Sequence, residues 1–522
     1  MFTSFSCHRL SALIVIFCFT ATAQSQPQNV HVSADTVSRY SPCEVSIAIN
    51  PRNPLAIVAG SNAQWLYTSS DGGQTWASAM LRTDFGSGCD PSLAFDDESN
   101  LYFASLGTGI GISRSRDGGM SFDTGATVGL EAGVQDKPTL AVDKRAGSGN
   151  TLALAWTRFD HYNSRKNSDT SRILCSISHD RGLTWSTPVR VDDAGGDCLD
   201  SSNTAEGAVP AFGPNGELYI VWSARDTIFF DKSLDGGVTF GRDKVIAVQP
   251  GGWNITEKRI FRANGIPVAV CDQFSASFKG RIYVLWGEVD DRSSTRHGVP
   301  DAYFICSADG GQTWSQPQNL TSADTAQHLF PTLAVDPITG HLFVAYYSMH
   351  PENGYSTDVY LACSTDGGGS FTTSKVSESQ FYPGNGAFLG DYISVAAYNR
   401  HVVPIWTRAD KNKTSIWAAL VFDTADAGAS GVRMTEDENP TQLRVNTSCP
   451  LGLELVLPAS ARLTIEVFDA LGRKCGPKYR GKFDAGKHRI PLYTNLSNGP
   501  YLITILDEER GAAWSWKFLF LR

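Results

Sequence analysis

Short apolar runs alternate with turns rich in Gly, Asp and Asn along residues 29–425. Apolar runs of this length, bounded by turn residues, are typical of β strands rather than of helices. One class of run has a small residue near its centre, which suits the crowded innermost strand of a repeated sheet. The runs in this class span residues 44–49, 90–95, 136–142, 206–212, 272–277, 330–335 and 391–397.

A second class of run follows each of the first, and four of its members end in Trp. These runs span residues 55–60, 101–106, 151–156, 217–222, 281–286, 341–347 and 402–406. A third run leads into a recurring turn sequence in six of the units, and a fourth leaves it. The repeating unit is therefore predicted to be a four-stranded sheet joined by loops of variable length.

The turn sequence has the pattern S-x-D-x-G-x-[TS]-[WF] and begins at Ser69, Ser115, Ser178, Ser233, Ser307 and Ser364. Its Asp carboxylate can accept backbone N–H groups from the residues that follow, and its Gly tolerates a positive φ. The Ser or Thr hydroxyl adds a local bond, and the aromatic ring packs between sheets. We interpret the six Asp residues as structural, because an active site is not built six times over. They are Asp71, Asp117, Asp180, Asp235, Asp309 and Asp366.

The pattern resembles the Asp box, or BNR repeat, of the sialidase superfamily of β-propellers. This resemblance implies an all-β propeller, and the seven inner-strand runs favour seven blades over the six of sialidases themselves. The last unit, 391–422, has three strands and no Asp box. We expect the strand at 29–33 to complete that unit, because this pairing closes the ring without an open edge.

A polar linker at 426–440 is followed by a smaller segment, 441–522, that reads as a β-sandwich. Its sequences VFDALGRK, from Val467, and NGPYLI, from Asn498, resemble the C-terminal sorting domain of type IX secretion. This resemblance implies that the secretion machinery is a partner. An appended sandwich with no sorting role is the alternative.

Residues 1–23 have the features of a secretory signal peptide: an apolar run after Arg9 and an A-x-A site ending at Ala23. No later stretch has the length of a transmembrane helix, so we expect a secreted or surface-displayed protein. The net charge is −9 and no run of Lys and Arg occurs, which argues against nucleic acid as a partner.

Export permits disulfides. Cys43 and Cys89 hold equivalent places in two successive repeats, and we predict a bridge between them. Cys198 with Cys271 is a second candidate pair. Cysteines that lead into the turn sequences are expected to be buried apolar side chains. These are Cys175, Cys306 and Cys363.

Candidate chemistry gathers where first strands begin and second strands end, since both lie on the face opposite the Asp boxes. In sialidases the substrate lies on this face. Strand starts supply Glu44, Asp90, Asp136, Glu206, Asp272 and Asp391, and strand ends supply Arg158, Arg225, Glu288 and Arg408. Trp156 and Trp222 either stack on a sugar or pack between blades. Long loops at 160–171, 193–206, 249–271 and 290–300 extend on the same face, as ligand-binding loops do.

Carboxylates gathered on one face repel one another unless Arg partners or cations neutralise their charge, or raised pKa values keep some of them protonated. Three interpretations follow: a structural ring of ion pairs, a divalent cation such as Ca²⁺, or a glycan site. No compact calcium loop is present, so we assign no metal ligands and expect no cofactor, with Ca²⁺ as the alternative.

The resemblance to sialidases does not extend to their first arginine motif, [FY]-R-[IL]-P. The sequence Phe261-Arg262-Ala263-Asn264 matches it neither in pattern nor in position. Tyr392, beside Asp391, is the nearest position for the family's nucleophile, with Asp136 and Glu288 as candidate carboxylates. The sequence leaves open whether the protein is an enzyme. It favours binding of an extracellular glycan or protein through the acidic face, with exo-sialidase-like glycoside hydrolysis as the alternative.

Overall fold

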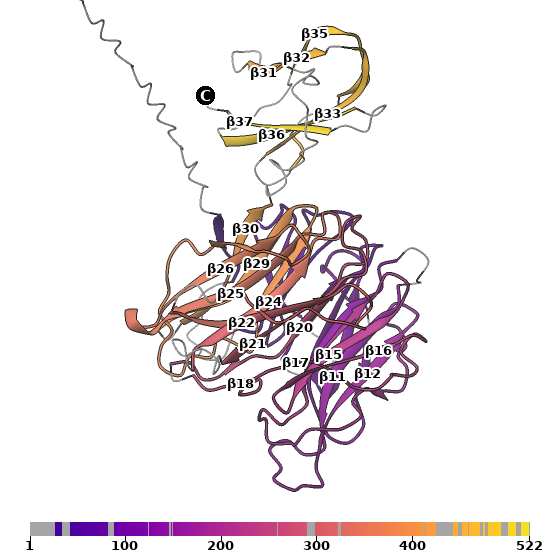
Figure 1. Ribbon diagram of the computed structural model, residues 1–522, viewed down its shortest axis with the longest axis vertical. Helices are drawn as coiled ribbons and strands as arrows, with labels where there is room; N and C mark the ends of the chain where they lie inside the picture. The colour runs from indigo at the N-terminus through magenta and orange to yellow at the C-terminus, as the bar shows by residue number, and fades with distance from the viewer. Residues whose placement is uncertain are drawn as a thin grey trace, which may run out of the picture.

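The computed structural model describes residues 27–33, 42–81, 88–123, 125–145, 148, 150–257, 259–289, 298–321, 325–411, 413–423 and parts of 442–520. The predicted signal peptide (1–23) and linker (426–440) lie outside the described residues. The only helical element among the described residues is a 3-10 turn, η1 (Pro351–Asn353). The prediction of an all-β propeller is confirmed (Figure 1).

The described residues between Gln28 and Phe422 form seven four-stranded antiparallel sheets. The first is β2 (Ser46–Ile49), β3 (Ile57–Ser61), β4 (Trp65–Ser69) and β5 (Ala77–Met80). The second is β6 (Ser92–Phe95), β7 (Leu101–Gly107), β8 (Gly109–Ser115) and β9 (Ala126–Val128). The third is β10 (Val134–Val142), β11 (Leu152–Phe159), β12 (Ser171–Ser178) and β13 (Val189–Arg190). The fourth is β14 (Glu206–Phe212), β15 (Leu218–Ala224), β16 (Thr227–Ser233) and β17 (Lys244–Val248).

The fifth sheet is β20 (Val268–Cys271), β21 (Ile282–Val289), β22 (Pro300–Ser307) and β23 (Gln318–Asn319). The sixth is β24 (Gln327–Val335), β25 (Leu342–His350), β26 (Ser356–Ser364) and β27 (Thr372–Lys375). The seventh contains β28 (Ser394–Tyr398), β29 (His401–Asp410) and β30 (Lys413–Phe422), with β1 (Gln28–His31) as its outer strand. A short ribbon, β18 (Asn254–Ile255) with β19 (Ala263–Asn264), lies in the loop between β17 and β20.

The sheets close into a ring because each packs on the next and the last packs on the first. The innermost strands β2, β6, β10, β14, β20, β24 and β28 contact one another in that order, and β28 contacts β2. A separate apolar cluster fills each interface between sheets. The cluster between the seventh and first sheets contains Ile47, Tyr67 and Ile405. A ring of this kind holds its core between the sheets rather than inside one sandwich.

The pairing of β1 with β30 completes the seventh sheet, as the sequence predicted. The register runs from Gln28 opposite Leu420 to His31 opposite Trp417. The first strand is also bound to the sixth sheet, because Asn29 Nδ2 donates to Val376 O at 2.7 Å and Asn29 Oδ1 accepts Glu378 N at 2.8 Å. The N-terminal segment therefore joins two neighbouring sheets.

One predicted inner strand is wrong. The fifth sheet uses β20, and the predicted run 272–277 lies in the turn that follows it. Asp272 is buried there and accepts the backbone N–H groups of Phe274 and Ser275. It therefore caps a turn at the end of the strand, on the face of the Asp boxes, and is not part of the acidic face.

The predicted disulfides are also absent. No bridge joins Cys43 to Cys89 or Cys198 to Cys271. Cys43 is fully buried and its sulfur accepts Asn62 Nδ2 at 2.9 Å, whereas Cys89 is exposed. Side chains at equivalent positions of successive blades have the same direction relative to their own sheets. Equivalent positions alone therefore do not bring two cysteine sulfur atoms within bonding distance.

The six turn sequences adopt one hydrogen-bonded geometry. In the first, Asp71 accepts Ser69 Oγ at 2.8 Å, Thr75 N at 3.0 Å and Thr75 Oγ1 at 2.6 Å, and Gly73 has φ +90°. The same Asp-to-hydroxyl bond recurs at Asp117, Asp180, Asp235, Asp309 and Asp366. These bonds lower the pKa of Asp117 and Asp366 to about 2. The structural role predicted for these aspartates agrees with their contacts.

Replacing Asp71 by Ala removes the acceptor of three hydrogen bonds in one turn. We expect the free energy of unfolding to fall by about 1–3 kcal/mol, because Thr75 N and the Ser69 hydroxyl lose their partner. Urea denaturation at pH 7 measures this change. Gln74→Ala is the matched control, since Gln74 makes one bond to the backbone O of Asp71. Equal losses for the two variants would contradict the assigned role of the carboxylate.

The C-terminal segment forms two further sheets. One contains β31 (Gln442–Asn446), β32 (Gly452–Leu457) and β35 (Gly486–Pro491). The other has the order β34 (Tyr479–Phe483), β33 (Ala461–Asp469), β36 (Gly499–Asp507) and β37 (Ala513–Phe520). Leu463, Ile465 and Ile503 are buried, so this segment has an apolar core of its own. Its assignment as a sorting domain stays a prediction.

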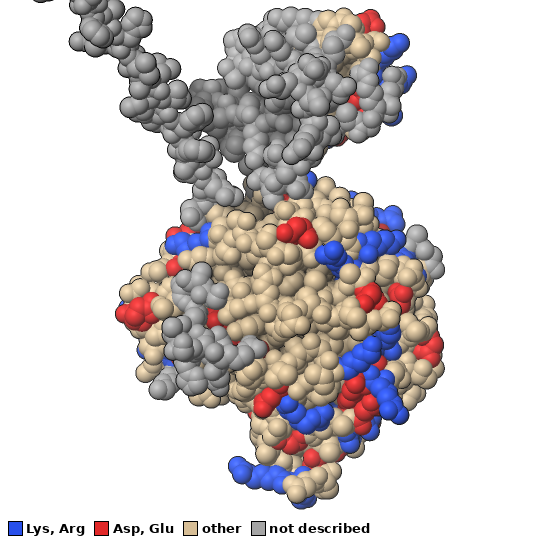
Figure 2. Space-filling view, viewed as in Figure 1, with Lys and Arg blue, Asp and Glu red and all other residues tan. Residues whose placement is uncertain are grey.

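The visible surface carries charges of both signs. On the face drawn in Figure 2, basic and acidic side chains lie interspersed over the propeller. Within the described part of the chain, no helix combines the length and apolar character needed to cross a bilayer.

Candidate functional site

The acidic starts of the inner strands lie at the end of the ring opposite the box turns. In the first sheet, Ile49 at the end of β2 is opposite Ile57, which is opposite Ser69 at the start of the box turn. Glu44, which precedes β2, is therefore at the far end of the same sheet. The equivalent pairing through Phe95, Leu101 and Ser115 places Asp90 likewise.

An open pocket of about 480 Å³ lies at this end of the ring. Its charged lining residues are Asp90, Asp136, Lys137, Asp200, Glu206, Arg262 and Asp391. It adjoins a channel of about 740 Å³ that is lined by residues from all seven inner strands or their approaches, among them Ser46, Ser92, Thr139, Val209, Val268, Thr332 and Ser394. The pocket is thus the mouth of the propeller's central channel.

Local backbone geometry decides which side chains reach the mouth. In the first three sheets, a residue with a left-handed φ of 48–57° lies two positions before the first paired residue of the regular part of the inner strand. These residues are Glu44, Asp90 and Lys137. A bulge in β10 and another in β14 shift the acid one residue earlier, to Asp136 and Glu206. Lys137 therefore takes the place that an acid has in the first two sheets, and brings a cation into the acidic mouth.

Two cations are held by specific partners. Arg262 Nε donates to Asp391 Oδ1 at 2.7 Å, a second Arg262 nitrogen contacts the other oxygen of Asp391, and Arg262 Nη1 lies 3.6 Å from Asp200 Oδ2. Burial opposes the charge of Arg262, but the carboxylate of Asp391 raises its pKa on balance. Lys137 Nζ lies 3.3 Å from the centre of the Tyr392 ring, and burial lowers the pKa of this ammonium group.

The carboxyl groups that remain are pushed toward their neutral forms. Burial, followed by repulsion from Asp90, raises the pKa of Glu44, and burial followed by repulsion from Glu206 raises the pKa of Asp136. Burial raises the pKa of Glu206 to about 8. The carboxyl group of Glu206 is buried, and its Oε1 accepts the backbone N–H of Gly207 at 3.0 Å. At neutral pH Glu206 therefore keeps its proton and can donate as well as accept hydrogen bonds.

Tyr392 is present at the mouth but is not prepared as a nucleophile. Its hydroxyl lies 3.5 Å from Asp90 Oδ1 and 3.4 Å from Pro91 O. Burial, and then the charge of Asp90, raises the pKa of Tyr392 well above its ordinary value. An acidic neighbour and a buried site both disfavour a phenolate, so these contacts do not favour the sialidase-like role predicted for Tyr392.

The structure does not bring the three predicted arginines together. Arg158 donates to Ala132 O and pairs with Asp160, Arg225 donates to Ala194 O and Gly195 O, and Arg408 pairs with Asp410. Each arginine is thus held within its own sheet or the adjoining loop. None of the three lines the pocket or the channel, so they stay separate at the ends of their second strands.

Three other predicted site residues are structural. Trp156 and Trp222 are fully buried; the indole of Trp156 donates to Gln135 Oε1 at 2.7 Å, and Trp222 stacks on Phe229. Glu288 is fully buried and its carboxylate accepts Trp286 Nε1 at 2.8 Å. None of these side chains lines the mouth, and the two Trp rings pack between sheets, which is one of the two alternatives that the sequence left open.

Lys137 and Asp200 were not predicted as site residues, and Arg262 was considered only as a failed match to the sialidase arginine motif. Asp200 and Arg262 come from loops 193–206 and 249–271, whose length was the available signal. Within the longer loop, β18 pairs with β19 and presents Arg262 and Asn264 to Asp391. Tyr162 from a third long loop donates its hydroxyl to Asp200 Oδ2 at 2.6 Å.

No protein family model matches this chain, and no curated protein does. Among solved structures, a protein of unknown function from Dyadobacter fermentans is similar over 76% of this chain and 99% of its own, at 14% identity and TM-score 0.42. The NanB sialidase of Streptococcus pneumoniae is similar over 76% of this chain and 70% of its own, at 12% identity and TM-score 0.38. The lectin of Aleuria aurantia matches 65% of this chain and 96% of its own, at 13% identity and TM-score 0.40.

Proposed function

We propose that this protein is an exported member of the sialidase-like Asp-box propellers that binds an uncharged or cationic extracellular ligand at the acidic mouth. A glycan is the favoured ligand class, and a protein surface is the other. One observation carries the proposal: Arg262, the arginine that lines the pocket, is already paired with Asp391 and lies close to Asp200. An anionic sugar would have to displace those carboxylates and enter an acidic site.

The chemistry of the mouth suits hydroxyl groups. Protonated carboxyl groups such as Glu206 donate hydrogen bonds, and ionised carboxylates accept them, so a sugar hydroxyl finds both kinds of partner. One exposed ring adjoins the pocket: Tyr162, whose hydroxyl is bonded to the pocket residue Asp200. Aromatic faces of this kind can cover the apolar side of a sugar ring.

Glycan-array binding of the mature protein tests this proposal. Neutral oligosaccharides are expected to bind, and their sialylated counterparts are expected to bind more weakly. Tyr162→Ala is expected to weaken binding about tenfold, equal to roughly 1.4 kcal/mol. Leu234→Ala is the matched control, because Leu234 is 73% exposed beside a box turn on the opposite face. Stronger binding of sialylated than of neutral glycans would overturn the assignment of ligand charge.

Glycoside hydrolysis is the second candidate, and Glu206 is the residue that favours it. A carboxyl group with a pKa of about 8 keeps its proton at neutral pH, as a general acid must. Glu206 also lines the pocket, where a ligand would lie. Turnover of neutral fluorogenic glycosides that disappears in Glu206→Gln would establish this activity. Binding without turnover would leave the protein a lectin-like module.

Export is part of the same proposal and has a separate test. Residues 1–23 would direct the chain out of the cytoplasm, and the segment from Val467 onward would carry the sorting signal for surface display. Deleting the chain from Val467 is expected to abolish surface labelling in the native host while leaving the propeller folded. Undiminished surface labelling of the truncated chain would remove the sorting role without affecting the ligand proposal.

A further inference from the structure

The seventh sheet ends with a modified version of the box turn. In the sixth sheet, Leu342 is opposite Ser364, which is the first residue of a box turn. In the seventh sheet, Val402 is opposite Val421 at the equivalent position. Two residues later, Asp423 therefore stands where the aspartate of the other turns stands. The Ser that would bond that aspartate is replaced by Val.

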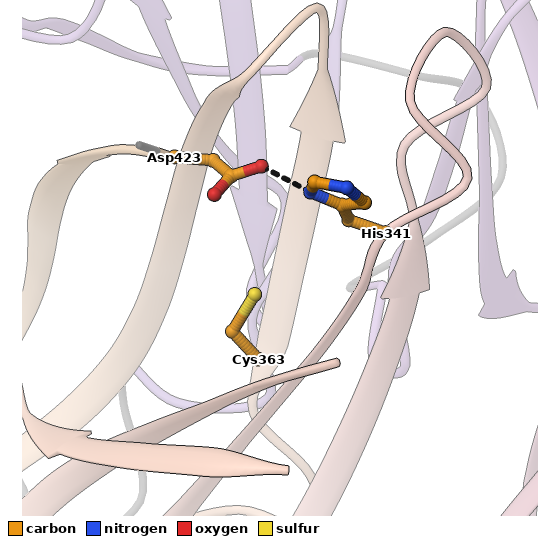
Figure 3. A group of neighbouring side chains, drawn as sticks. All are labelled: His341, Cys363 and Asp423. Atoms are coloured by element: carbon orange, nitrogen blue, oxygen red, sulfur yellow. Dashed lines mark hydrogen bonds and ion pairs between the residues drawn. The ribbon is translucent and has the colours of Figure 1, made fainter. Parts of the chain in front are cut away.

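The Asp423 carboxylate contacts the neighbouring sheet, and Arg400 Nη1 of its own sheet lies 3.9 Å from Asp423 Oδ2. Asp423 Oδ2 lies 2.5 Å from Nδ1 of His341, the residue that precedes β25 in the sixth sheet. Both side chains are almost fully buried, at 3% exposure for His341 and 2% for Asp423. Cys363, the residue before Ser364 in β26, is partly buried and directs its sulfur toward the pair (Figure 3).

The three side chains present one nitrogen, one sulfur and one oxygen donor to a common point. These donor atoms all lie within 4.8 Å of one another. On a tetrahedral zinc ion with bonds of about 2.0–2.3 Å, neighbouring donors are about 3.3–3.8 Å apart. Side-chain rotations that move the donor atoms by about 1 Å would bring them to that spacing. The three donors would leave a fourth coordination position for water or a further ligand.

We propose that His341, Cys363 and Asp423 form a binding site for Zn²⁺ or a similar divalent transition metal. The mixture of imidazole, thiolate and carboxylate selects such an ion over Ca²⁺ or Mg²⁺, which prefer oxygen donors. Binding releases the thiol proton and replaces the proton held between Nδ1 and Asp423, so affinity increases with pH. This site lies on the face of the box turns and is independent of the acidic mouth.

The position of the site suggests what the metal does. It links the sixth sheet to the seventh, the one sheet that is completed by the N-terminal strand. In a second contact across the same interface, the aspartate comes from the sixth sheet instead of the seventh. Asp336 accepts the backbone N–H groups of Asn399 at 3.1 Å and Arg400 at 2.6 Å. A bound metal would therefore stabilise the ring next to its closure.

Cobalt titration of the metal-free mature protein tests the proposal directly. One equivalent of Co²⁺ is expected to bind and to produce the near-ultraviolet thiolate-to-cobalt absorption band, and Zn²⁺ is expected to abolish that band by displacement. Cys363→Ser should lose the band. Cys306→Ser should keep it, because Cys306 is the residue before the box Ser307 one sheet earlier and is likewise partly buried.

Stability gives the second measurement. Zn²⁺ is expected to raise the Tm of the wild-type protein and of Cys306→Ser, and to leave the Tm of Cys363→Ser and Asp423→Asn unchanged. Melting of each variant without metal shows whether it is folded. A wild-type protein that binds no equivalent of Co²⁺, or a Cys363→Ser variant that keeps the absorption band, would overturn the proposal.

Discussion

A chain that begins at Pro42, and so lacks β1, is expected to be less stable than a chain that begins at Pro27 by about 3–6 kcal/mol. Four residue pairs join β1 to β30, and each lost backbone hydrogen bond costs about 0.5–1.5 kcal/mol. Val30 and Val32 also belong to the apolar cluster between the seventh and first sheets. The measurement is urea denaturation, together with light scattering, because the exposed edge of β30 can pair with another chain.

Asn29→Ala is the control for this truncation. It removes the side-chain bonds to Val376 and Glu378 but leaves the four strand pairs in place. Its loss should be about 1–2 kcal/mol and should not be accompanied by association. If the truncated chain were as stable as Asn29→Ala and stayed monomeric, the closure of the ring through β1 would not contribute to folding.

The free energy of unfolding is expected to decrease by roughly 4 kcal/mol between pH 4.5 and pH 8 because of Glu206. The pKa of Glu206 is about 8 in the folded protein and near 4.5 in the unfolded chain. Below pH 4.5 both states are protonated and the stabilisation is fully present. As pH rises to 8, the unfolded chain releases the proton while the folded protein retains it, so the stabilisation is lost.

The aspartates of the box turns have the opposite effect in acid. The pKa values of Asp117 and Asp366 are lowered to about 2, so their contribution is present above pH 4 and is lost as pH falls toward 2. The two effects together predict maximum stability in mildly acidic solution, near pH 4–5.

Denaturation series from pH 2 to pH 9 measure the pH profile. Glu206→Gln should flatten the limb above pH 4.5, whereas Glu131→Gln, a change at an exposed glutamate, should leave it unchanged. The limb below pH 4 should be the same in both variants. An unchanged upper limb in Glu206→Gln would mean that Glu206 is ionised at the mouth, and would also weaken its candidacy as a general acid.

The repeated elements could be predicted from the sequence because each depends on residues that are close together in the chain. The box turn at Ser69 needs only its own Ser, Asp, Gly and Thr, and all six copies have the same bonds. The fifth inner strand was misplaced because the runs IPVAVC and DQFSAS both satisfy the pattern of a small-centred strand. Only packing against the neighbouring strands β14 and β24 decides between them.

The candidate sites were readable only in part. Acids at inner-strand starts, such as Asp90 and Asp136, were found because a regular ring brings equivalent positions together. Arg262 was dismissed because its motif differs from that of sialidases, although it pairs with Asp391, which lies 129 residues away in the sequence. The triad of His341, Cys363 and Asp423 had no signal, since no short spacing connects its members.

The sequence by itself determined the repeating unit, the number of inner strands, the box turns and the closure by the N-terminal strand. Each of these depends on local hydrogen bonding or on a pattern that repeats. The tertiary structure alone decided which charges meet. The loop that carries Arg262 places it against Asp391. Bulges in β10 and β14 determine which side chain faces the channel. Asp423 contacts His341 of the neighbouring sheet. Such choices depend on contacts between residues far apart in the chain, which no local pattern encodes.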